Sequence, residues 1–278
     1  MNSFFRIFTF AFASSAVRYL FFAGIGYIVC YLIGRRVLLH RKIQARFPQG
    51  ADYLREIVYS LTTCVIFGIV AAIIFSPAVS RHTALYFRVQ DRGWLYFVAT
   101  IPIMIVIHDA YFYWSHRLLH WWPIFRVVHA VHHQSNNPSP WAALSFHPLE
   151  ALVQAGVFVI LAFFIPVHPL ALLIFFLWTT FSNVVGHLGF ELFSRRFTAS
   201  RWGRWFNSST NHNLHHQNPH GNYGLFFRFW DEWMSTTHSN YDEVLRTVQE
   251  AASRPAHSAP KSGHGVHHGS LHTSKTAT

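Results

Sequence analysis

Apolar runs dominate the hydropathy pattern of the chain. Three of them cover residues 16–33, 57–80 and 93–107, and a fourth covers residues 151–190. A membrane-spanning helix needs about 20 apolar residues, so the first three runs predict one span each. The fourth run is twice that length, contains no Asp, Glu, Lys or Arg, and is interrupted by Pro-Val-His-Pro at residues 166–169. We therefore expect it to form a helical hairpin.

These runs predict an all-α fold of polytopic membrane helices, with about five spans of which the last two form the hairpin. We divide the chain into an N-terminal membrane region with two spans (1–92), a second domain (93–250) and a tail (251–278). The second domain is expected to carry the remaining spans and a histidine-rich helical cap. The tail is rich in Ser, Gly, His and Pro, a composition that buries too little apolar surface to order itself.

Composition supports a membrane protein. Of the 278 residues, 51% are hydrophobic and only 12% are charged, whereas soluble domains carry about 25% charged residues. The 28 phenylalanines exclude a disordered chain, and ordinary Gly and Pro content excludes a collagen-like one. Cys30 and Cys64 both lie inside apolar runs, so they are expected to be buried thiols rather than a disulfide framework.

The charge pattern predicts the orientation in the membrane. The net charge is +11, and so apolar a chain is not expected to bind nucleic acid. The densest basic loop between spans, residues 35–56, holds six Lys or Arg and is therefore assigned to the cytoplasm by the positive-inside rule. Counting spans onward from this loop places the histidine motifs, described next, on the same cytoplasmic side.

The candidate chemistry lies in the histidines. An HxxxH motif ends the third span, and two HxxHH motifs follow it, with His147 and His187 among the histidines between them. Residues three and four apart share one face of a helix, so each motif can direct its imidazoles at one metal ion. A tetrahedral zinc site takes four ligands, so this number of histidines implies two metals. The candidate ligands are His116, His120, His129, His132, His133, His147, His187, His212, His215 and His216.

The order of these motifs resembles the fatty acid hydroxylase/sterol desaturase superfamily. The resemblance rests on Asp109-xxx-Tyr-Trp-x-His116-Arg-xx-His120, the two HxxHH motifs, Asn222-Tyr-Gly and Trp230-Asp-Glu. It implies an integral-membrane enzyme that uses two non-haem iron ions and O2 to hydroxylate or desaturate a C–H bond of a lipid. The Phe-His-Pro-Leu-Glu segment around His147 is closer to the sterol desaturase branch. Asn183 stands where the fatty acid 2-hydroxylase branch has a histidine, and His147 is the candidate to replace it.

The same resemblance implies that electrons come from a separate carrier, cytochrome b5-like or ferredoxin-like. The chain has neither a GxGxxG fingerprint nor a P-loop, so we expect no bound nicotinamide or flavin. Asp109 lies seven residues before His116 and is expected either to orient a ligand imidazole or to cap a helix or face a cavity. Glu150 and Glu191 are weaker candidates for the same orienting role.

Two other functions fit parts of the pattern. A membrane metal-binding or transport protein without redox chemistry would also need clustered histidines, although transporters place ionisable ligands near the bilayer midplane. A zinc-dependent lipid hydrolase would need a general base such as the Glu of HExxH, which neither HxxHH copy offers. The motifs do not distinguish a sterol, a fatty acyl chain, a carotenoid or an alkylglycerol as the substrate.

Overall fold

The computed structural model describes residues 3–253, and these residues form helices joined by loops, without a β-strand. The expected all-α fold is confirmed. Most of the tail predicted for residues 251–278 falls outside the described residues; its first three residues end the last helix. The helices are α1 (Ser3–Tyr27), α2 (Arg35–Leu38), α3 (Gly50–Ile74), α4 (Pro77–Ser80), α5 (Trp94–Leu119), α6 (Trp122–Ile124), α7 (Ala130–His133), α8 (Pro148–Phe164), α9 (Pro169–Gly186), α10 (Arg195–Thr198), α11 (Ser209–Gln217), α12 (Phe229–Trp233) and α13 (Tyr241–Ser253).

Four helices among the described residues are long and apolar enough to cross a membrane. They are α1 with the π-helical turn that continues it to Ile33, then α3, α5 and α9. Helix α8 is also apolar but has 17 residues, the lower limit for a span. The protein is therefore a multi-pass membrane protein, with the predicted hairpin formed by α8 and α9.

The helix bounds differ from the apolar runs at several places, and two of them have a local explanation. Helix α1 begins at Ser3, well before the expected residue 16, because the polar side chains near Ser14 do not prevent a helix from continuing. Helix α3 ends at Ile74, and Pro77 starts the short helix α4 instead. Proline is well tolerated at the first position of a helix but not in its interior. The break in the hairpin falls as predicted, between Phe164 and Pro169.

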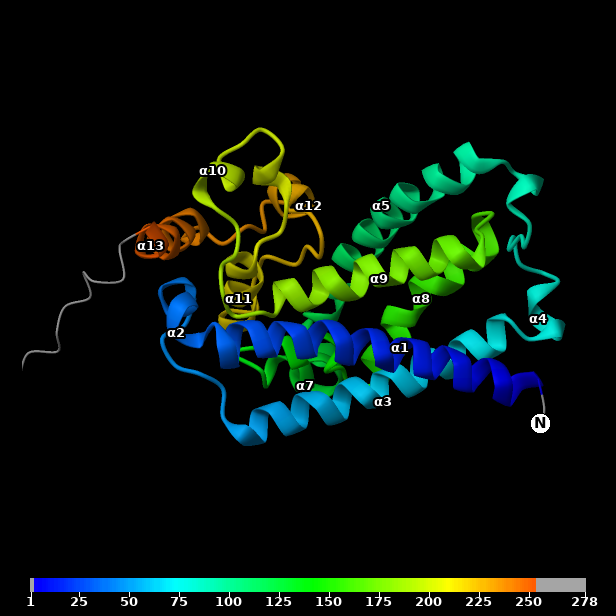
Figure 1. Ribbon diagram of the computed structural model, residues 1–278, viewed down its shortest axis with the longest axis horizontal. Coiled ribbons are helices and arrows are strands. Elements are labelled where there is room, and N and C mark those ends of the chain that lie inside the picture. The colour runs from blue at the N-terminus through cyan, green and yellow to red at the C-terminus, as the bar shows by residue number, and fades with distance from the viewer. Residues whose placement is uncertain (1–2, 254–278) are drawn as a thin grey trace, which may run out of the picture.

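The helices run between two distinct ends of an elongated bundle (Figure 1). Helices α2, α10, α11, α12 and α13 lie at one end and form the cap, beside the basic segment that follows α1. The N-terminus, α4 and the turn between α8 and α9 lie at the opposite end. The histidine motifs follow α5 and α9 toward the cap. This arrangement places the histidine motifs toward the cap and away from the far end of the bundle.

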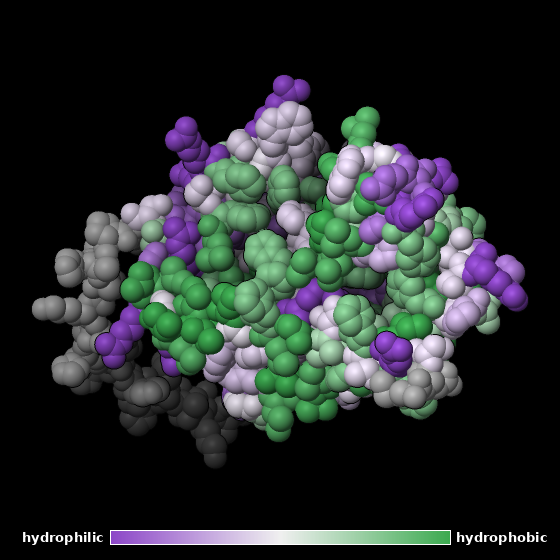
Figure 2. All heavy atoms as spheres, turned by 45° about the vertical axis from the view of Figure 1, so that its right-hand side comes forward, coloured by the Kyte–Doolittle hydropathy of each residue, from purple (hydrophilic) through white to green (hydrophobic). Residues whose placement is uncertain are grey.

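Packing inside the bundle is apolar, and so is much of its outer surface. Helices α5, α8 and α9 share a core that includes Met104, Leu161 and Phe175, all fully buried. Helix α1 packs along α3, where a Cβ on Gly68 would come within 3.1 Å of the Phe12 side chain. Large apolar side chains such as Phe10 remain exposed, and Figure 2 shows apolar residues over much of one face. Such a surface suits contact with lipid.

The two ends of the bundle are predicted to face opposite sides of the membrane. Arg36 follows α1 at the cap end, and Arg81 follows α4 at the far end; both are exposed. Single substitutions Arg36→Cys and Arg81→Cys should therefore react with a membrane-impermeant maleimide from opposite sides, while the native Cys30 and Cys64 are buried. Arg196→Cys in the cap should behave as Arg36→Cys does. Labelling of Arg36→Cys and Arg81→Cys from one and the same side would contradict the arrangement.

Candidate metal centre

Four separate segments bring histidines together at the cap end of the bundle. The last turn of α5 supplies His116, and His120 is the residue that ends this helix. A π-helical turn and α7 carry the first HxxHH motif, and His187 ends helix α9. Helix α11 carries the second HxxHH motif and is buried along most of its length. Helix spacing thus orients each motif, and the ends of two membrane helices place the rest.

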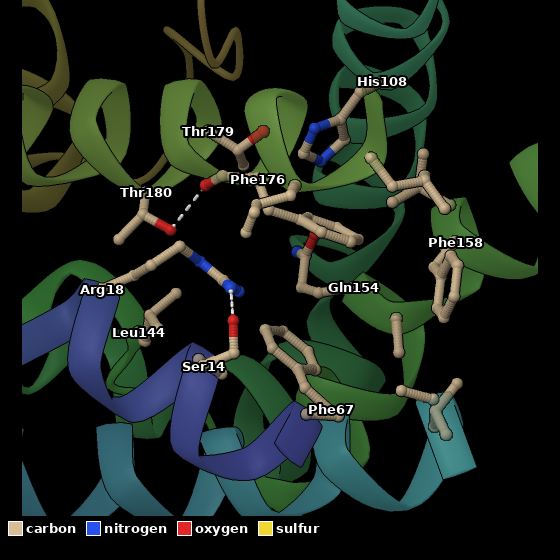
Figure 3. Close-up of a pocket in the computed structure, with 18 of the residues that line it drawn as sticks. Ser14, Arg18, Phe67, His108, Leu144, Gln154, Phe158, Phe176, Thr179 and Thr180 are labelled. Carbon is tan, nitrogen blue, oxygen red and sulfur yellow. Dashed lines mark hydrogen bonds between the residues drawn. The ribbon is translucent and has the colours of Figure 1, made fainter. Parts of the chain in front are cut away.

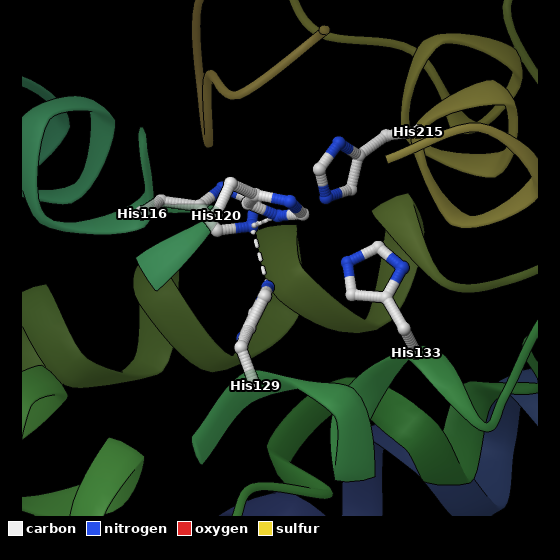
Figure 4. A group of neighbouring side chains, drawn as sticks. All are labelled: His116, His120, His129, His133 and His215. Carbon is white, nitrogen blue, oxygen red and sulfur yellow. Dashed lines mark hydrogen bonds between the residues drawn. The ribbon is translucent and has the colours of Figure 1, made fainter. Parts of the chain in front are cut away.

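Nine of the ten predicted ligands form two adjoining clusters. Within each cluster, one potential ligand atom of every residue lies within 4.8 Å of the others. Figure 4 shows the first cluster, in which imidazoles from α5, α7 and α11 converge. The rings of His133 and His216, one from each cluster, are 4.9 Å apart between centroids. The first cluster consists of His116, His120, His129, His133 and His215, and the second of His132, His187, His212 and His216.

Hydrogen bonds to the outer ring nitrogens fix the protonation of several imidazoles. The Nδ1 atoms of His132 and His187 lie 3.3 Å and 2.8 Å from the carbonyl oxygens of Ser145 and Asn183. A carbonyl oxygen only accepts, so each Nδ1 must carry the proton, and each neutral ring then has a lone pair at Nε2. These two Nε2 atoms are 3.3 Å apart. Two lone pairs cannot form a hydrogen bond with each other, but both can bind one cation.

The first cluster repeats this arrangement. His116 donates from Nδ1 to the carbonyl oxygen of Tyr223 at 2.9 Å, and its Nε2 faces the Nε2 of His129 at 3.0 Å. His215 donates from Nδ1 to the carbonyl oxygen of Gly221 at 2.7 Å, and its buried Nε2 has no hydrogen-bond partner. Unpartnered buried nitrogens are rare in folded proteins. The donor set therefore fits metal ions, for which neutral imidazole is a common ligand.

Burial keeps these imidazoles in the ligand form. Desolvation is the main cause that lowers the pKa of each, and neighbouring histidines lower it further in most of them. The pKa of His133 falls to about 3 and that of His187 to about 4. The pKa values of His129, His215 and His216 are also far below the usual range. The rings are consequently neutral at physiological pH, as metal binding requires.

One carboxylate reaches the clusters directly. Oε1 of Glu150, in the first turn of α8, lies 2.8 Å from Nδ1 of His129, and both side chains are fully buried. A carboxylate in this position orients the imidazole and holds the proton on Nδ1. The orienting role expected of Glu150 therefore has support in its geometry.

Asp109 has a different role from the orienting one considered above. Its Oδ1 accepts hydrogen bonds from the backbone N–H groups of Phe226 at 2.8 Å and Phe227 at 3.2 Å, and it contacts no clustered histidine. Glu191 likewise accepts from the backbone and side chain of Thr210, at the start of α11. Both carboxylates anchor cap segments to the membrane helices, and in this way they position the second HxxHH motif.

His147 is not brought to either cluster. Its Nδ1 accepts a hydrogen bond from the backbone N–H of Leu149 at 3.3 Å, so the ring caps the N-terminus of α8. Asn183, at the position that suggested a missing histidine, donates to the carbonyl oxygen of Ala143 at 2.6 Å. The backbone carbonyl oxygen of Asn183 instead accepts the hydrogen bond from Nδ1 of His187. The structure thus supplies four nitrogens to the second cluster without His147.

The Asn-Tyr-Gly segment after the second HxxHH motif contributes to the site through its backbone conformation. Asn222 has a φ of 55°, a left-handed conformation that asparagine adopts more readily than most residues. Its side chain is buried and bonds to the carbonyl oxygen of Asn211 and to the N–H of His238. This turn presents the carbonyl oxygens of Gly221 and Tyr223 to His215 and His116. Sequence spacing gives no signal for such backbone acceptors.

Fold and site together define an integral membrane protein with two adjoining histidine clusters at one end of its helices, each of which could hold a metal ion. A fatty acid hydroxylase family model matches residues 101–236, which include all nine clustered histidines. This match and the relatives below support membership of the fatty acid hydroxylase/sterol desaturase superfamily, in its sterol desaturase branch. No solved structure matches it.

Its relatives include sterol desaturases and oxidases. A delta(7)-sterol 5(6)-desaturase of Gibberella zeae is 26% identical, over 83% of this chain and 73% of the relative. A lathosterol oxidase of Mus musculus is 27% identical, over 64% of this chain and 58% of the relative. A delta(7)-sterol-C5(6)-desaturase of Nicotiana tabacum is 32% identical, over 58% and 59%.

The positions of His147 and His187 lead to a testable contrast in metal binding. His187→Asn should remove a nitrogen from the second cluster and abolish tight binding of one of two Co²⁺ ions titrated into metal-stripped protein. His147→Asn should leave both binding events intact, because Asn can still cap α8. Optical titration of the Co²⁺ bands measures both. Loss of one Co²⁺ in His147→Asn, or two retained in His187→Asn, would overturn the assignment of the clusters.

Proposed function

We propose that this protein is a membrane-bound di-iron oxygenase that hydroxylates or desaturates a C–H bond of a lipid, of the sterol or fatty acyl type. The observation that carries the proposal is the pair of adjoining clusters whose imidazole lone pairs converge. Membership of the superfamily and the similarity to sterol desaturases and oxidases support the lipid chemistry.

The two clusters would hold one iron ion each. The first offers five imidazoles and the second four, and imidazole ligands suit iron as well as zinc. When bound, the two ions would supply the O2-dependent oxidation of an unactivated C–H bond. The ring orientations are set by the chain itself, through Glu150 and the carbonyl oxygens that accept from Nδ1. Such partners typically change metal affinity or activity by about 10- to 100-fold when removed.

Apolar residues separate the clusters from water on the membrane side. The ring of Phe112 packs 4.9 Å from that of His116, and the ring of Phe146 packs 5.1 Å from that of His132. Both phenylalanines also line a cavity between the membrane helices. A lipid could therefore bring a C–H bond to the centre without leaving an apolar environment, and bulk water would be kept out.

The charge on the surface of the cap is relevant to the source of the electrons and to the side of the membrane that the cap faces. The reaction needs an external reductant, and a carrier of the cytochrome b5 or ferredoxin kind is the proposed partner. Exposed arginines at the cap end, Arg36, Arg195, Arg196 and Arg201 among them, would attract an acidic carrier and speed its docking. The same positive charge supports the proposal that this end, with the clusters, faces the cytoplasm, as the positive-inside rule would predict.

Substitution of one ligand should separate oxidation from membrane insertion. We expect His132→Ala to reduce lipid oxidation by more than about 100-fold, because even a residue that only orients a ligand is worth about 10- to 100-fold. The variant should still enter the membrane, since insertion depends on apolar helix length. Mass spectrometry of lipids from cells with wild type, His132→Ala or no protein measures this, and His147→Asn is the matched control.

Dependence on O2 distinguishes an oxygenase from a metal transporter. The wild-type lipid product should appear only with both O2 and an electron donor. A product that persists in His132→Ala or forms under nitrogen would contradict the di-iron mechanism. Metal flux that is lost in His132→Ala and indifferent to O2 would instead identify a transporter.

A further inference from the structure

A cavity of about 220 Å³ lies between helices α1, α3, α5, α8 and α9. Most of its lining is apolar, and Figure 3 shows Phe67, Leu144, Phe158 and Phe176 among the lining residues. Near the metal centre its wall is formed by Phe112, Phe146 and Asn183, which contact His116, His132 and His187. The cavity therefore extends from the interior of the bundle to residues that contact both clusters.

An arginine without an acidic partner lies in this apolar cavity. Arg18 is the middle residue of the span Ser3–Ile33, and its side chain projects into the cavity, where Nη1 donates to the Ser14 hydroxyl at 2.6 Å (Figure 3). Its buried Nε has no hydrogen-bond partner, and no carboxylate of the described residues lies within ion-pair distance of it. A charge at the centre of a bilayer is costly, and such residues generally mark a functional site.

Two further polar side chains face the same space without partners. His108 and Gln154 are 5% and 7% exposed, and the buried Nδ1 of His108 and Nε2 of Gln154 make no hydrogen bond. Figure 3 shows both side chains lining the same cavity as Arg18. The amide Nε2 of Gln154 can only donate, as can the guanidinium of Arg18. A positive charge and spare donors in an apolar cavity match a ligand with an oxyanion at one end and a hydrocarbon chain at the other.

We propose that this cavity binds a single-chain lipid whose acidic head group, a carboxylate or phosphate, pairs with Arg18. This inference rests on the proposed oxygenase function for the reaction and adds to it the class of substrate. The guanidinium of arginine presents a rigid fork of donors that matches carboxylate and phosphate oxygens, and a neutral hydroxyl uses only part of it. The sterol hydroxyl of the relatives' substrates would leave the charge of Arg18 without a counter-ion.

The position of Arg18 also predicts where along its hydrocarbon chain the lipid is oxidised. The guanidinium of Arg18 lies 5.5 Å from the ring centroid of Phe176. Phe176 precedes His187 by 11 residues, and eleven residues of helix α9 extend over about 16 Å. The ring that Arg18 contacts thus belongs to a residue about three helical turns before His187, and oxidation is expected along the lipid chain rather than at the carbon next to the acid.

Ligand binding tests this directly and without turnover. We would measure binding of palmitate, hexadecyl phosphate, hexadecanol and cholesterol to the purified metal-loaded protein in lipid nanodiscs. Palmitate or hexadecyl phosphate should bind at least about tenfold more tightly than hexadecanol or cholesterol, as expected for hydrogen bonds to a charged group. Whichever acid binds better identifies the head group.

Substitutions test whether Arg18 is responsible for the preference for the acid. Arg18→Leu should abolish the preference for the acid and leave hexadecanol affinity unchanged, whereas Arg18→Lys should retain part of it. Arg6→Leu, which removes an exposed arginine of the same helix, should bind as wild type. The wild-type comparison of palmitate with hexadecanol remains decisive if Arg18→Leu does not fold.

Equal binding of the acid and the alcohol to wild type would overturn the proposal, as would cholesterol binding as tightly as the acid or an unchanged preference in Arg18→Leu. Failure of the oxygenase function is distinguishable, because acid binding should persist in His132→Ala. Acid binding that depends on Arg18 in a protein that oxidises no lipid would refute the oxygenase and leave the acid site intact.

Discussion

Imidazole lone pairs that face one another at about 3 Å are the constraint on which this structure depends. The Nε2 atoms of His132 and His187, and those of His116 and His129, are close enough for hydrogen bonds that their protonation does not allow. Repulsion of this kind is relieved by a cation between the nitrogens. The two clusters therefore explain why four distant segments meet, why the cap folds over the helix ends, and why buried carbonyl oxygens and Glu150 surround the rings.

The membrane helices place this centre and supply its surroundings. Helix α5 ends in the first cluster, and helix α9 ends in the second. Anchors from these helices and their neighbours hold the cap: Asp109 binds the segment at Phe226, and Tyr113 bonds to Thr236 at 3.0 Å. The cavity between the helices contains Arg18 along its length and reaches the residues that pack on both clusters. The proposed binding and oxidation of a lipid would thus use the same bundle.

The features that could be predicted from the sequence are those that depend on a local pattern of residues. Apolar length predicted the spans, Pro-Val-His-Pro predicted the hairpin, and the helical spacing of the histidine motifs predicted eight of the nine residues that converge, His187 being the ninth. The rest depends on contacts between distant segments. Asp109 bonds to residues more than 100 positions away, and the alternatives for it could not be resolved from spacing. His147 carries the same imidazole as the clustered histidines, but its backbone position at the start of α8 keeps it out of both clusters. Arg18 is a charge inside an apolar run, which marks it as a candidate functional residue, but only the cavity around it shows what that charge can bind.

The metal content of the protein tests the central claim most directly. The account predicts close to two iron ions per chain in wild-type protein purified without chelators, because two separate clusters of neutral imidazoles are present. Elemental analysis by mass spectrometry, together with protein quantitation, gives this ratio. A ratio near zero in protein from iron-replete cells, or two equivalents of zinc with no iron, would contradict a di-iron centre.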